Sequence, residues 1–277
     1  MEWRKLKNIM ILILLVVNGF LLVLVWSRRE ESASYQRAAL EQTVRVLNKS
    51  GIEVDLDAAS PADSLPPLTV ERDLDRELQL ARGLLGQDAQ ADNRGGGLYL
   101  YQNGAGQLSV RPGGELSAEL QEDSRWSTGH PARHAAGLLR DMGLEAEELE
   151  TVQEDGQTRV RFRQVWNGAA VFSCEVEFVY ENDALGAIRG TLVAAGQGTA
   201  EGGQALTLPT ALMRFSEGIA SAGDVCTAIR SMEAGYRGTV QSLSGGVRLA
   251  PVWLVTTDTA DYYLDGVTGA LTRLTDR

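Results

Sequence analysis

The sequence predicts an α+β protein in which an N-terminal transmembrane helix precedes an external domain of helices packed on antiparallel sheets. Two observations support this fold class. Residues 9–26 form an apolar run of 18 residues without a charge, long enough to cross a membrane. Further along, residues 131–194 and 210–274 each show a helical period followed by alternating strands separated by turns.

The apolar run decides where the rest of the chain lies. At about 1.5 Å per residue, a helix of this length spans roughly 27 Å, close to the thickness of the hydrocarbon layer. Three basic residues precede the run and two follow it: Arg4, Lys5 and Lys7, then Arg28 and Arg29. This excess favours a cytoplasmic N-terminus. We therefore expect a single-pass protein of the cell membrane with an extracytoplasmic C-terminal domain.

A cleaved signal peptide is the competing interpretation. Its apolar region is usually shorter, about 7–15 residues, and ends in small residues such as A-x-A. Here the run ends in Trp26-Ser27-Arg28-Arg29. Trp3 and Trp26 lie at its two ends, where indole rings favour the membrane interface. These features favour an uncleaved anchor.

Asn18 and Gly19 lie near the middle of the run. An amide in hydrocarbon gains from a hydrogen bond to a partner helix, and glycine allows a close approach. These two residues are therefore the candidate partner-binding site of the membrane helix. The alternative is that Asn18 is a tolerated polar residue on an isolated span.

The charge of the chain limits the kinds of partner. The chain has 26 Lys and Arg against 37 Asp and Glu, a net charge of −11. Residues 1–29 hold five of the basic residues and one acid, so the remainder has 21 basic and 36 acidic residues, or −15. An acidic external domain argues against nucleic acid as a partner, and against attraction to anionic lipid or wall polymer by bulk charge.

The elements follow from periodicity and turn residues. After the anchor we expect a helix at 30–50 ended by Gly51, a strand at 52–56, a loop at 58–67, a helix at 70–85, a loop at 86–97 and a hairpin of 98–101 with 108–110. A second unit has a helix at 131–142 and strands at 159–166, 170–180 and 187–194, with turns at Asn167-Gly168 and Glu181-Asn182-Asp183. A third unit has a helix at 210–220 and strands at 225–236, 251–257, 261–264 and 270–274.

The second and third units look like internal repeats. Residues 169–172 match 250–253 in place and character, and residues 185–188 match 268–271. The expected divisions are a cytoplasmic stub and anchor at 1–29, an N-terminal α+β region at 30–126, and repeat units at 127–204 and 205–277.

The residues show no catalytic, cofactor or metal pattern. His130 and His134 have the i, i+4 spacing of zinc ligands, but His130 precedes Pro131 and no H-E-x-x-H motif is present. The acids Asp258, Asp261 and Asp265 do not have the spacing of an EF-hand, and solvated hairpin positions are the better interpretation. Glu145, Glu147, Glu148 and Glu150 suggest a solvated helix end and exit loop. We expect no enzyme, no cofactor and no metal.

The remaining residues of interest are cysteines and aromatics. Cys174 lies on the apolar face of a strand, so two buried small hydrophobes are expected at Cys174 and Cys226. The sequence leaves open whether Cys174 and Cys226 form a disulfide in an oxidising compartment. Tyr236 and Trp253 are expected in the core, and Trp126 is a candidate for an exposed contact.

Two segments resemble a known family. The opening Met1-Glu-Trp-Arg-Lys-Leu-Lys-Asn-Ile, running into an apolar span that contains Asn18, resembles the start of the YycI-type regulators. These are single-span membrane proteins that act with their relative YycH on the WalK sensor kinase of low-GC Gram-positive bacteria. The segments 235–236, 249–255 and 262–271 resemble both that family and the broader PepSY-like domains. Residues 162–172 resemble the same pattern.

The resemblance implies a non-enzymatic function. It implies a regulator of a WalK-like two-component sensor histidine kinase that governs cell-wall metabolism, acting through its transmembrane helix and a YycH-like partner. The residues expected to contact the kinase are Asn18 and Gly19. The alternative is a PepSY-type extracytoplasmic module that binds or inhibits an envelope protease or peptide.

Overall fold

The structure is a computed structural model that describes residues 2–55, 65–122, 128–194, 197–203, 205–241 and 246–274. In the first helix, the described side chains are those at 7, 10, 11, 13–15, 17–20 and from 35 onward. Most of the loop expected at 58–67 lies outside the described residues. The side chains of Trp3 and Trp26 and the whole of Trp126 lie outside them too.

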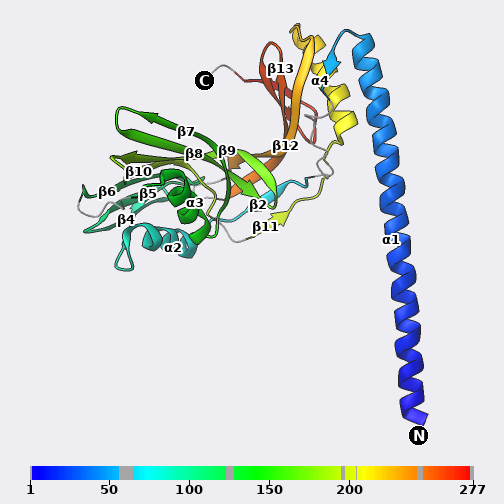
Figure 1. Ribbon diagram of the computed structural model, residues 1–277, viewed down its shortest axis with the longest axis horizontal. Coiled ribbons are helices and arrows are strands. Elements are labelled where there is room, and N and C mark those ends of the chain that lie inside the picture. The colour runs from blue at the N-terminus through cyan, green and yellow to red at the C-terminus, as the bar shows by residue number, and fades with distance from the viewer. Residues whose placement is uncertain are drawn as a thin grey trace.

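The first helix, α1 (Glu2–Lys49), is continuous, so the helix expected at 30–50 extends the apolar run. Gly51 ends it with a φ of +86°, a conformation that glycine adopts without strain. Figure 1 shows α1 extending away from the other elements, with only its last turns beside α4. Within the part of the chain that the structure describes, no helix has the length and apolarity of a membrane span.

The described residues repeat one pattern, a helix followed by a four-stranded antiparallel meander. The first unit is α2 (Leu74–Leu85), β3 (Gln90–Gly95), β4 (Leu98–Asn103), β5 (Gly106–Val110) and β6 (Glu115–Leu120). The second is α3 (Pro131–Asp141), β7 (Glu145–Glu154), β8 (Gln157–Trp166), β9 (Ala169–Glu181) and β10 (Ala184–Thr191). The third is α4 (Leu208–Ala222), β12 (Ala228–Val240), β13 (Val247–Thr257), β14 (Asp261–Asp265) and β15 (Leu271–Arg273).

Local sequence explains the helix starts and the hairpin turns. The Asp73 carboxylate accepts a hydrogen bond from the Arg76 backbone N–H at 3.0 Å and so caps α2. Proline is the first residue of α3, where its missing N–H costs nothing. The turns Asn167-Gly168 and Asn182-Asp183 have positive φ at both residues, as two-residue hairpins require. The sequence predicted both turns.

The first two units form one sheet because their last strands pair. β10 and β6 are antiparallel from Ala187 opposite Glu119 to Thr191 opposite Glu115. The resulting order is β7-β8-β9-β10-β6-β5-β4-β3, so the second unit is related to the first by an approximate two-fold. Side chains from α2 and α3 share one buried apolar cluster with this sheet, and both helices cover the same face (Figure 1).

The third unit has its own core and also holds the end of α1. Phe215 and Leu212 of α4 are buried against Trp253 of β13 and Tyr262 of β14. Leu47 of α1 is 1% exposed in the same cluster. The short strand β1 (Glu53–Val54), just after α1, pairs in parallel with β12. The first helix of the chain therefore docks on the last unit.

The third unit meets the second where β12 crosses β9. These strands pair in parallel at Gly235 opposite Ala170 and at Tyr236 opposite Val171. A Cβ on Gly235 would lie 2.5 Å from the Ala170 carbonyl oxygen and 2.6 Å from the Phe172 ring, so only glycine fits there without a shift. Two further strands, β2 (Leu68–Val70) and β11 (Gly198–Ala200), extend the edge beyond β13. We name this contact between the second and third units the joint.

The structure confirms the α+β class and corrects several elements. The loop expected at 86–97 contains β3, and the acid-rich segment after α3 is β7. Both are polar strands at the ends of the sheet, where little apolar alternation marks a strand. The helix expected at 70–85 begins at Leu74, because Leu68–Val70 pairs with β13 as a strand.

The internal repeat is present, but one of its residue matches is wrong. Residues 185–188 lie in the first half of β10, and residues 268–271 lead into β15, so both segments are at the fourth strand of their units. Residues 169–172, however, begin a third strand, whereas 250–253 lie in a second strand. Short apolar alternations look alike from strand to strand and do not fix which strand is which. The divisions expected at 126/127 and 204/205 fall next to residues outside the described ranges and stay predictions.

Candidate functional site

The predicted partner-binding residues, Asn18 and Gly19, lie in the N-terminal half of α1 (Glu2–Lys49). Figure 1 shows that this half of the helix stands clear of the three units. The Asn18 side-chain amide donates to the Leu14 carbonyl oxygen at 2.9 Å, one turn back in the same helix. The Asn18 Oδ1 has no partner among the described residues, so it keeps the ability to accept. A Cβ added at Gly19 would meet nothing within 4 Å. These two positions therefore present an acceptor and an open backbone surface.

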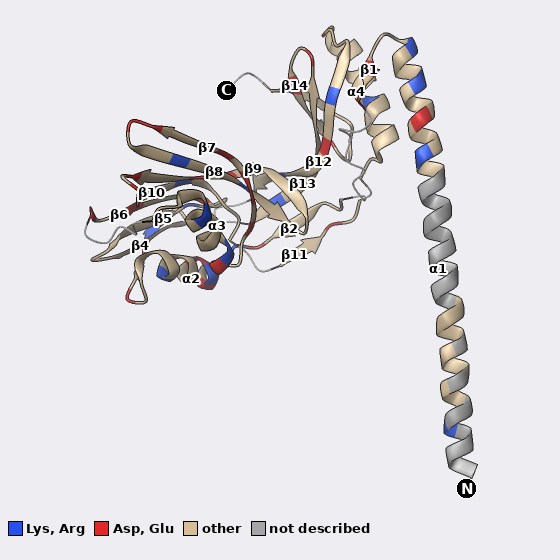
Figure 2. Ribbon diagram, viewed as in Figure 1, with Lys and Arg blue, Asp and Glu red and all other residues tan. Residues whose placement is uncertain are grey.

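The far end of α1 is fixed to the third unit. Leu47 is buried against α4, and the chain turns at Gly51 into β1, whose Glu53 N–H donates to the Thr227 carbonyl oxygen at 2.8 Å. The last turns of α1 contain three basic residues and one acidic residue, namely Arg37, Arg45, Lys49 and Glu41 (Figure 2). Because α1 continues without interruption to the docked turn, a tilt of one end would displace the other.

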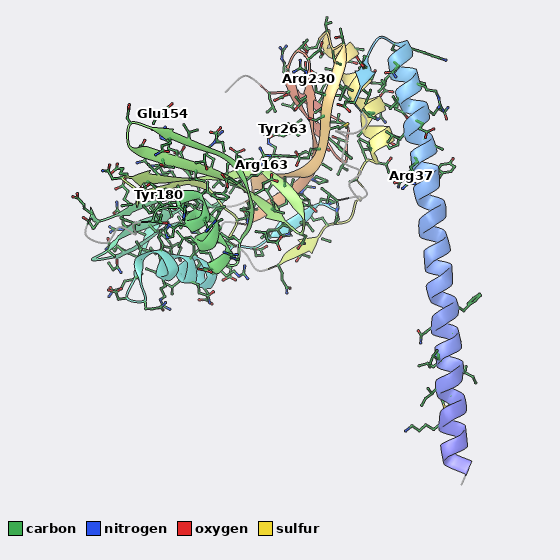
Figure 3. The ribbon with its side chains drawn as sticks, viewed as in Figure 1. Arg37, Glu154, Arg163, Tyr180, Arg230 and Tyr263 are labelled. Carbon is green, nitrogen blue, oxygen red and sulfur yellow. The ribbon has the colours of Figure 1, made fainter. Side chains whose placement is uncertain are left out.

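A cleft of about 500 Å³ lies beside the joint. Its walls are Arg163 and Glu175 of the second unit, and residues of β13, β14 and the hairpin between them in the third unit. Figure 3 labels Arg163 and Tyr263, which lie where the two units approach each other. The cleft is lined mainly by polar groups, in contrast with the apolar clusters on either side of it.

Arg163 is surrounded by carboxylates in this cleft. Its guanidinium lies 3.2 Å from the Glu175 carboxylate and 3.5 Å from the Glu147 carboxylate, and it stacks over the Phe172 ring at 5.3 Å. The Arg163 Nε is buried and has no hydrogen-bond partner among the described residues. Burial, together with the charge of Glu147, raises the pKa of Glu233 above its usual value, and the Arg163 charge opposes this rise only partly.

An aromatic contact connects the two walls of the cleft. Phe172 of β9 and Tyr263 of β14 lie with ring centroids 5.8 Å apart, and the Arg237 guanidinium lies 5.5 Å from the Tyr263 ring centroid. Such pairs are worth about 0.5–1.5 kcal/mol beyond the area that they bury. This site was not predicted from the sequence. Charged residues at every second position of β8 indicate a solvent-facing side of the sheet. No local pattern, however, indicates that β14 lies across the cleft from β8.

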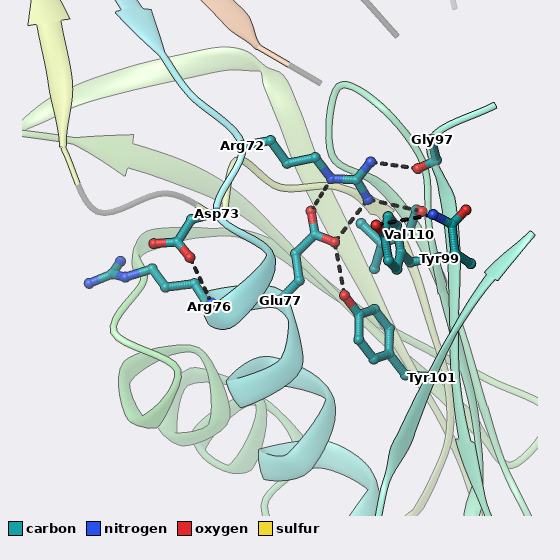
Figure 4. Close-up of polar contacts among 9 residues, drawn as sticks. Arg72, Asp73, Arg76, Glu77, Gly97, Tyr99, Tyr101 and Val110 are labelled. Atoms are coloured by element: carbon teal, nitrogen blue, oxygen red, sulfur yellow. Dashed lines mark hydrogen bonds and ion pairs between the residues drawn. The ribbon is translucent and has the colours of Figure 1, made fainter. Parts of the chain in front are cut away.

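A second charged site is fully enclosed in the first unit (Figure 4). Arg72 and Glu77 form a two-point ion pair at 2.6 and 2.8 Å, and their side chains are 7% and 4% exposed. The Tyr101 hydroxyl donates to Glu77 at 3.2 Å, and Arg72 also donates to the Gly97 carbonyl oxygen. Burial and the neighbouring Glu77 raise the pKa of Tyr101. The Arg72 and Glu77 charges are paired with each other, so the network holds α2 against β4 and leaves no charge for binding a ligand.

The two histidines of the chain lie at the start of α3. His134 Nδ1 lies 2.9 Å from the Tyr180 hydroxyl, and burial lowers the pKa of His134. His130 lies outside the helix as its N-cap. Within the described parts of the chain, no group of three or more His, Cys, Asp or Glu is placed to hold a metal.

The other residues named in the sequence analysis are buried in the fold or hydrogen-bonded within it. Cys174 and Cys226 are buried free thiols, and burial raises the pKa of Cys174 to about 11. Asp258 accepts hydrogen bonds from the Thr227 hydroxyl and the Ala228 N–H, which lower its pKa to about 2. Asp265 accepts from the backbone of the following turn. Tyr236 and Trp253 are buried, as expected, at 2% and 3% exposure.

The comparisons with known proteins are sparse. No protein-family model matches the chain. No curated protein matches it. Among solved structures, the chain is similar to the YpeB C-terminal domain from Bacillus megaterium, with a TM-score of 0.38 and 13% identity over 75% of this chain and 100% of that domain. A similarity at this level carries no conclusion about function.

Proposed function

We propose that this chain is a non-enzymatic, membrane-anchored regulator of a two-component sensor histidine kinase that controls cell-wall metabolism. In this proposal, residues 9–26 cross the membrane once, the N-terminus is cytoplasmic and the three units are extracytoplasmic. The transmembrane helix contacts the helices of a WalK-like kinase, and the external units contact a YycH-like partner.

One observation carries the proposal. The apolar run and the docked segment of the chain belong to one uninterrupted helix, Glu2–Lys49, whose end is buried in the third unit. A passive anchor needs only a flexible linker between membrane and domain. A helix that continues into the core instead couples the orientation of the span to the orientation of the external units.

Asn18 supplies the contact in this proposal. Its amide N–H is already bonded to Leu14, whereas its Oδ1 is available to a donor on a neighbouring helix. Hydrogen bonds of this kind between membrane helices are worth about 0.6–2 kcal/mol. Gly19 lets the partner backbone approach closely, so the two adjacent residues act together.

Co-purification from native membranes in mild detergent tests the proposal. The native chain is compared with a chain whose residues 9–26 are replaced by a neutral Leu/Ala helix, and the bound kinase is measured by its autophosphorylation. We expect the kinase to be recovered with the native chain and lost with the replacement. Asn18→Leu should give a partial loss, and Val17→Leu, on the neighbouring position, should give none. Equal recovery with both anchors would contradict the proposal.

The cleft beside the joint favours a second candidate function, a PepSY-type extracytoplasmic module that binds an envelope protease or peptide. Its walls carry more carboxylates than cations around Arg163, and a basic extended peptide would complement them. In this case the full chain with the replaced anchor should bind its target as tightly as the native chain. Glu175→Gln should weaken that binding, and loss of binding on anchor replacement alone would exclude this function.

A further inference from the structure

The last turns of α1 pack on the third unit through one side of the helix. Leu47, Val44 and Thr43 are 1%, 7% and 9% exposed, and Leu40 packs on the same apolar cluster as Leu47. Val46, next to Leu47 but rotated away from it, is 45% exposed. Figure 1 shows all three units on one side of α1, with α4 beside its last turns. We name the side that carries Leu40, Thr43, Val44 and Leu47 the unit side of α1.

The regular turn of the helix places Asn18 on the unit side. The helix is continuous from Glu2 to Lys49, and at 3.6 residues per turn each residue is rotated by about 100° from the one before. Leu47 follows Asn18 by 29 residues, which is about 8.1 turns, so the two side chains differ in direction by only about 20°. Gly19 is rotated by about 80° to the other flank of Leu47. A helix that touches both Asn18 and Gly19 is therefore centred on the unit side.

The unit side remains accessible above the apolar run. Gln36 follows Asn18 by 18 residues, or about five turns, so it points in the same direction, and it is exposed. Phe20 and Ala38 are exposed too, but they are rotated by about 180° from Leu47. Gln36 and Ala38 therefore mark opposite sides of the same stretch of helix.

The length of the accessible stretch limits what can bind there. The apolar run ends at residue 26, and the contact with the third unit begins at Leu40. The 13 residues between them span about 20 Å at 1.5 Å per residue. A helix that lies along the unit side can therefore continue for about 20 Å beyond the membrane before it meets the third unit.

A second copy of this chain does not fit on the unit side. Its own α1 continues for 23 residues beyond the apolar run, or about 35 Å, as far as Lys49. In a symmetric pair held through Asn18, each α1 would lie on the unit side of the other at about 8–10 Å. The two third units would then have to occupy the same space. The occupant is therefore a different protein.

We propose that the unit side of α1, from Leu15 to Gln36, is the docking surface for one membrane helix of a different protein, which leaves the membrane beneath the third unit. That helix ends or turns within about 20 Å of the membrane. This placement rests on the proposed function, in which residues 9–26 cross the membrane and the partner is a sensor kinase. The contact at Asn18 and the third unit then act on the same element of the partner.

Site-specific photocrosslinking of the full chain in native membranes tests the docking surface. p-Benzoylphenylalanine replaces one residue at a time, either Leu15 or Gln36 on the unit side, or Phe20 or Ala38 on the opposite side. Adducts with the kinase are identified by mass spectrometry. We expect adducts from Leu15 and Gln36 and none from Phe20 and Ala38. Recovery of the kinase with any other pattern of adducts would overturn the docking surface and leave the proposed function standing.

Insertions that rotate the units test whether the third unit acts on the bound helix. Two alanines between Ala33 and Ser34 turn the units by about 200° around α1, so that they no longer stand over a helix bound at Asn18. Four alanines turn them by only about 40° and raise them by about one turn. We expect the two-residue insertion to abolish the effect of the chain on kinase autophosphorylation and the four-residue insertion to retain it. An equal effect of both chains would overturn the placement.

A measurement without the kinase separates this inference from the proposed function. The purified full chain with p-benzoylphenylalanine at Gln36 is irradiated in liposomes at a high protein-to-lipid ratio. We expect no adduct between two copies, because the third unit excludes a second α1 from the unit side. An adduct between two copies would overturn the inference whatever the kinase does. Failure to recover a kinase from native membranes would instead contradict the proposed function, and with it the partner named here.

Discussion

The first two units are joined in a different way from the second and third, although all three repeat one helix-and-meander pattern. β6 and β10 pair antiparallel over five registered positions and share one buried cluster with α2 and α3. The joint has two registered positions between β12 and β9, and two smaller apolar clusters pack around it, one with Val171, Cys174, Tyr236 and Leu249 and one with Phe172 and Val252. The first connection is a longer ladder over one large core, and the second is a short ladder over two small apolar clusters.

The difference indicates where the molecule can change shape. Inside the eight-stranded sheet, a rotation of one unit against the other would break a continuous ladder of hydrogen bonds. At the joint, a rotation would break a shorter ladder and disturb two small apolar clusters, and it would change the width of the charged cleft. Because α1 is docked on the third unit, the same rotation would also change the angle of α1 against the first two units.

The largest effect is expected from Arg72→Met in the first unit. The substitution leaves the Glu77 carboxylate buried without its cation, which costs about 3–5 kcal/mol of unfolding free energy. Urea unfolding of the full chain in detergent measures this loss. Hydrogen exchange should speed up in the strands of both the first and the second unit, because they form one body. Faster exchange confined to the first unit would contradict the prediction that the first and second units unfold together.

A matched control exists for that substitution. Arg45 and Glu41 form an ion pair on α1 at 3.8 Å, with side chains 66% and 67% exposed. Arg45→Met should cost no more than about 0.5 kcal/mol, because exposed pairs contribute little.

The next largest effect is expected from Leu47→Ala, which removes the buried contact between α1 and the third unit. A buried leucine truncated to alanine costs about 2–5 kcal/mol. Limited proteolysis should detect it as faster cleavage between α1 and β1, with the eight-stranded sheet unaffected. Val46→Ala is the control, because Val46 is 45% exposed. Equal cleavage of both variants would mean that α1 is not held by this contact.

Gly235→Ala tests the joint itself. Its new Cβ would press on the Ala170 carbonyl oxygen and the Phe172 ring, and overpacking of this kind costs about 1–3 kcal/mol. Spin labels on α3 and α4 of the full chain should show a changed distance between the second and third units. In contrast, Gly83→Ala, in a helix with nothing within 4 Å, should gain about 0.5–1 kcal/mol. An unchanged distance in the Gly235 variant would show that the joint absorbs the strain locally.

Much of this arrangement could be predicted from the sequence, and the missing part has a physical reason. Helices with a regular apolar face were predicted where they occur, as at Leu138 and Leu139 of α3, and so were the turns at Asn167-Gly168 and Asn182-Asp183. Polar edge strands were not predicted, because β3 is exposed along its whole length. Local periodicity reports only which face of an element is buried.

The candidate sites depend on contacts between segments far apart in the chain, which no local pattern encodes. Phe172 and Tyr263 meet across the cleft, and Leu47 packs on a helix that starts at residue 208. Asn18 and Gly19 could be named from the sequence because the apolar run around them is a purely local property. Their partner-binding role stays a prediction.

The smallest effect is expected from Glu233→Gln at the joint. In the folded chain, burial and Glu147 raise the pKa of Glu233 above its ordinary value of 4.5, so the folded state holds a proton that the unfolded state has released. Stability should therefore fall as the pH rises from about 4.5 through the raised value, and the loss should persist at neutral pH. The other charges that face Glu233 are Glu147 of β7 and Arg163 of β8. Melting temperatures of the full chain from pH 4 to pH 8 measure this dependence.

Glu233→Gln should raise the melting temperature at pH 7 and leave it nearly unchanged at pH 4, where the carboxyl is protonated in both states. Glu154→Gln, on the exposed end of β7, should change neither value. A Glu233 variant that is equally stable at both pH values would mean that this carboxyl is already hydrated, and therefore that the joint is open in solution. A stabilised variant would instead show a closed joint in which the burial of Glu233, together with repulsion from Glu147, limits how tightly the third unit, and α1 with it, is held.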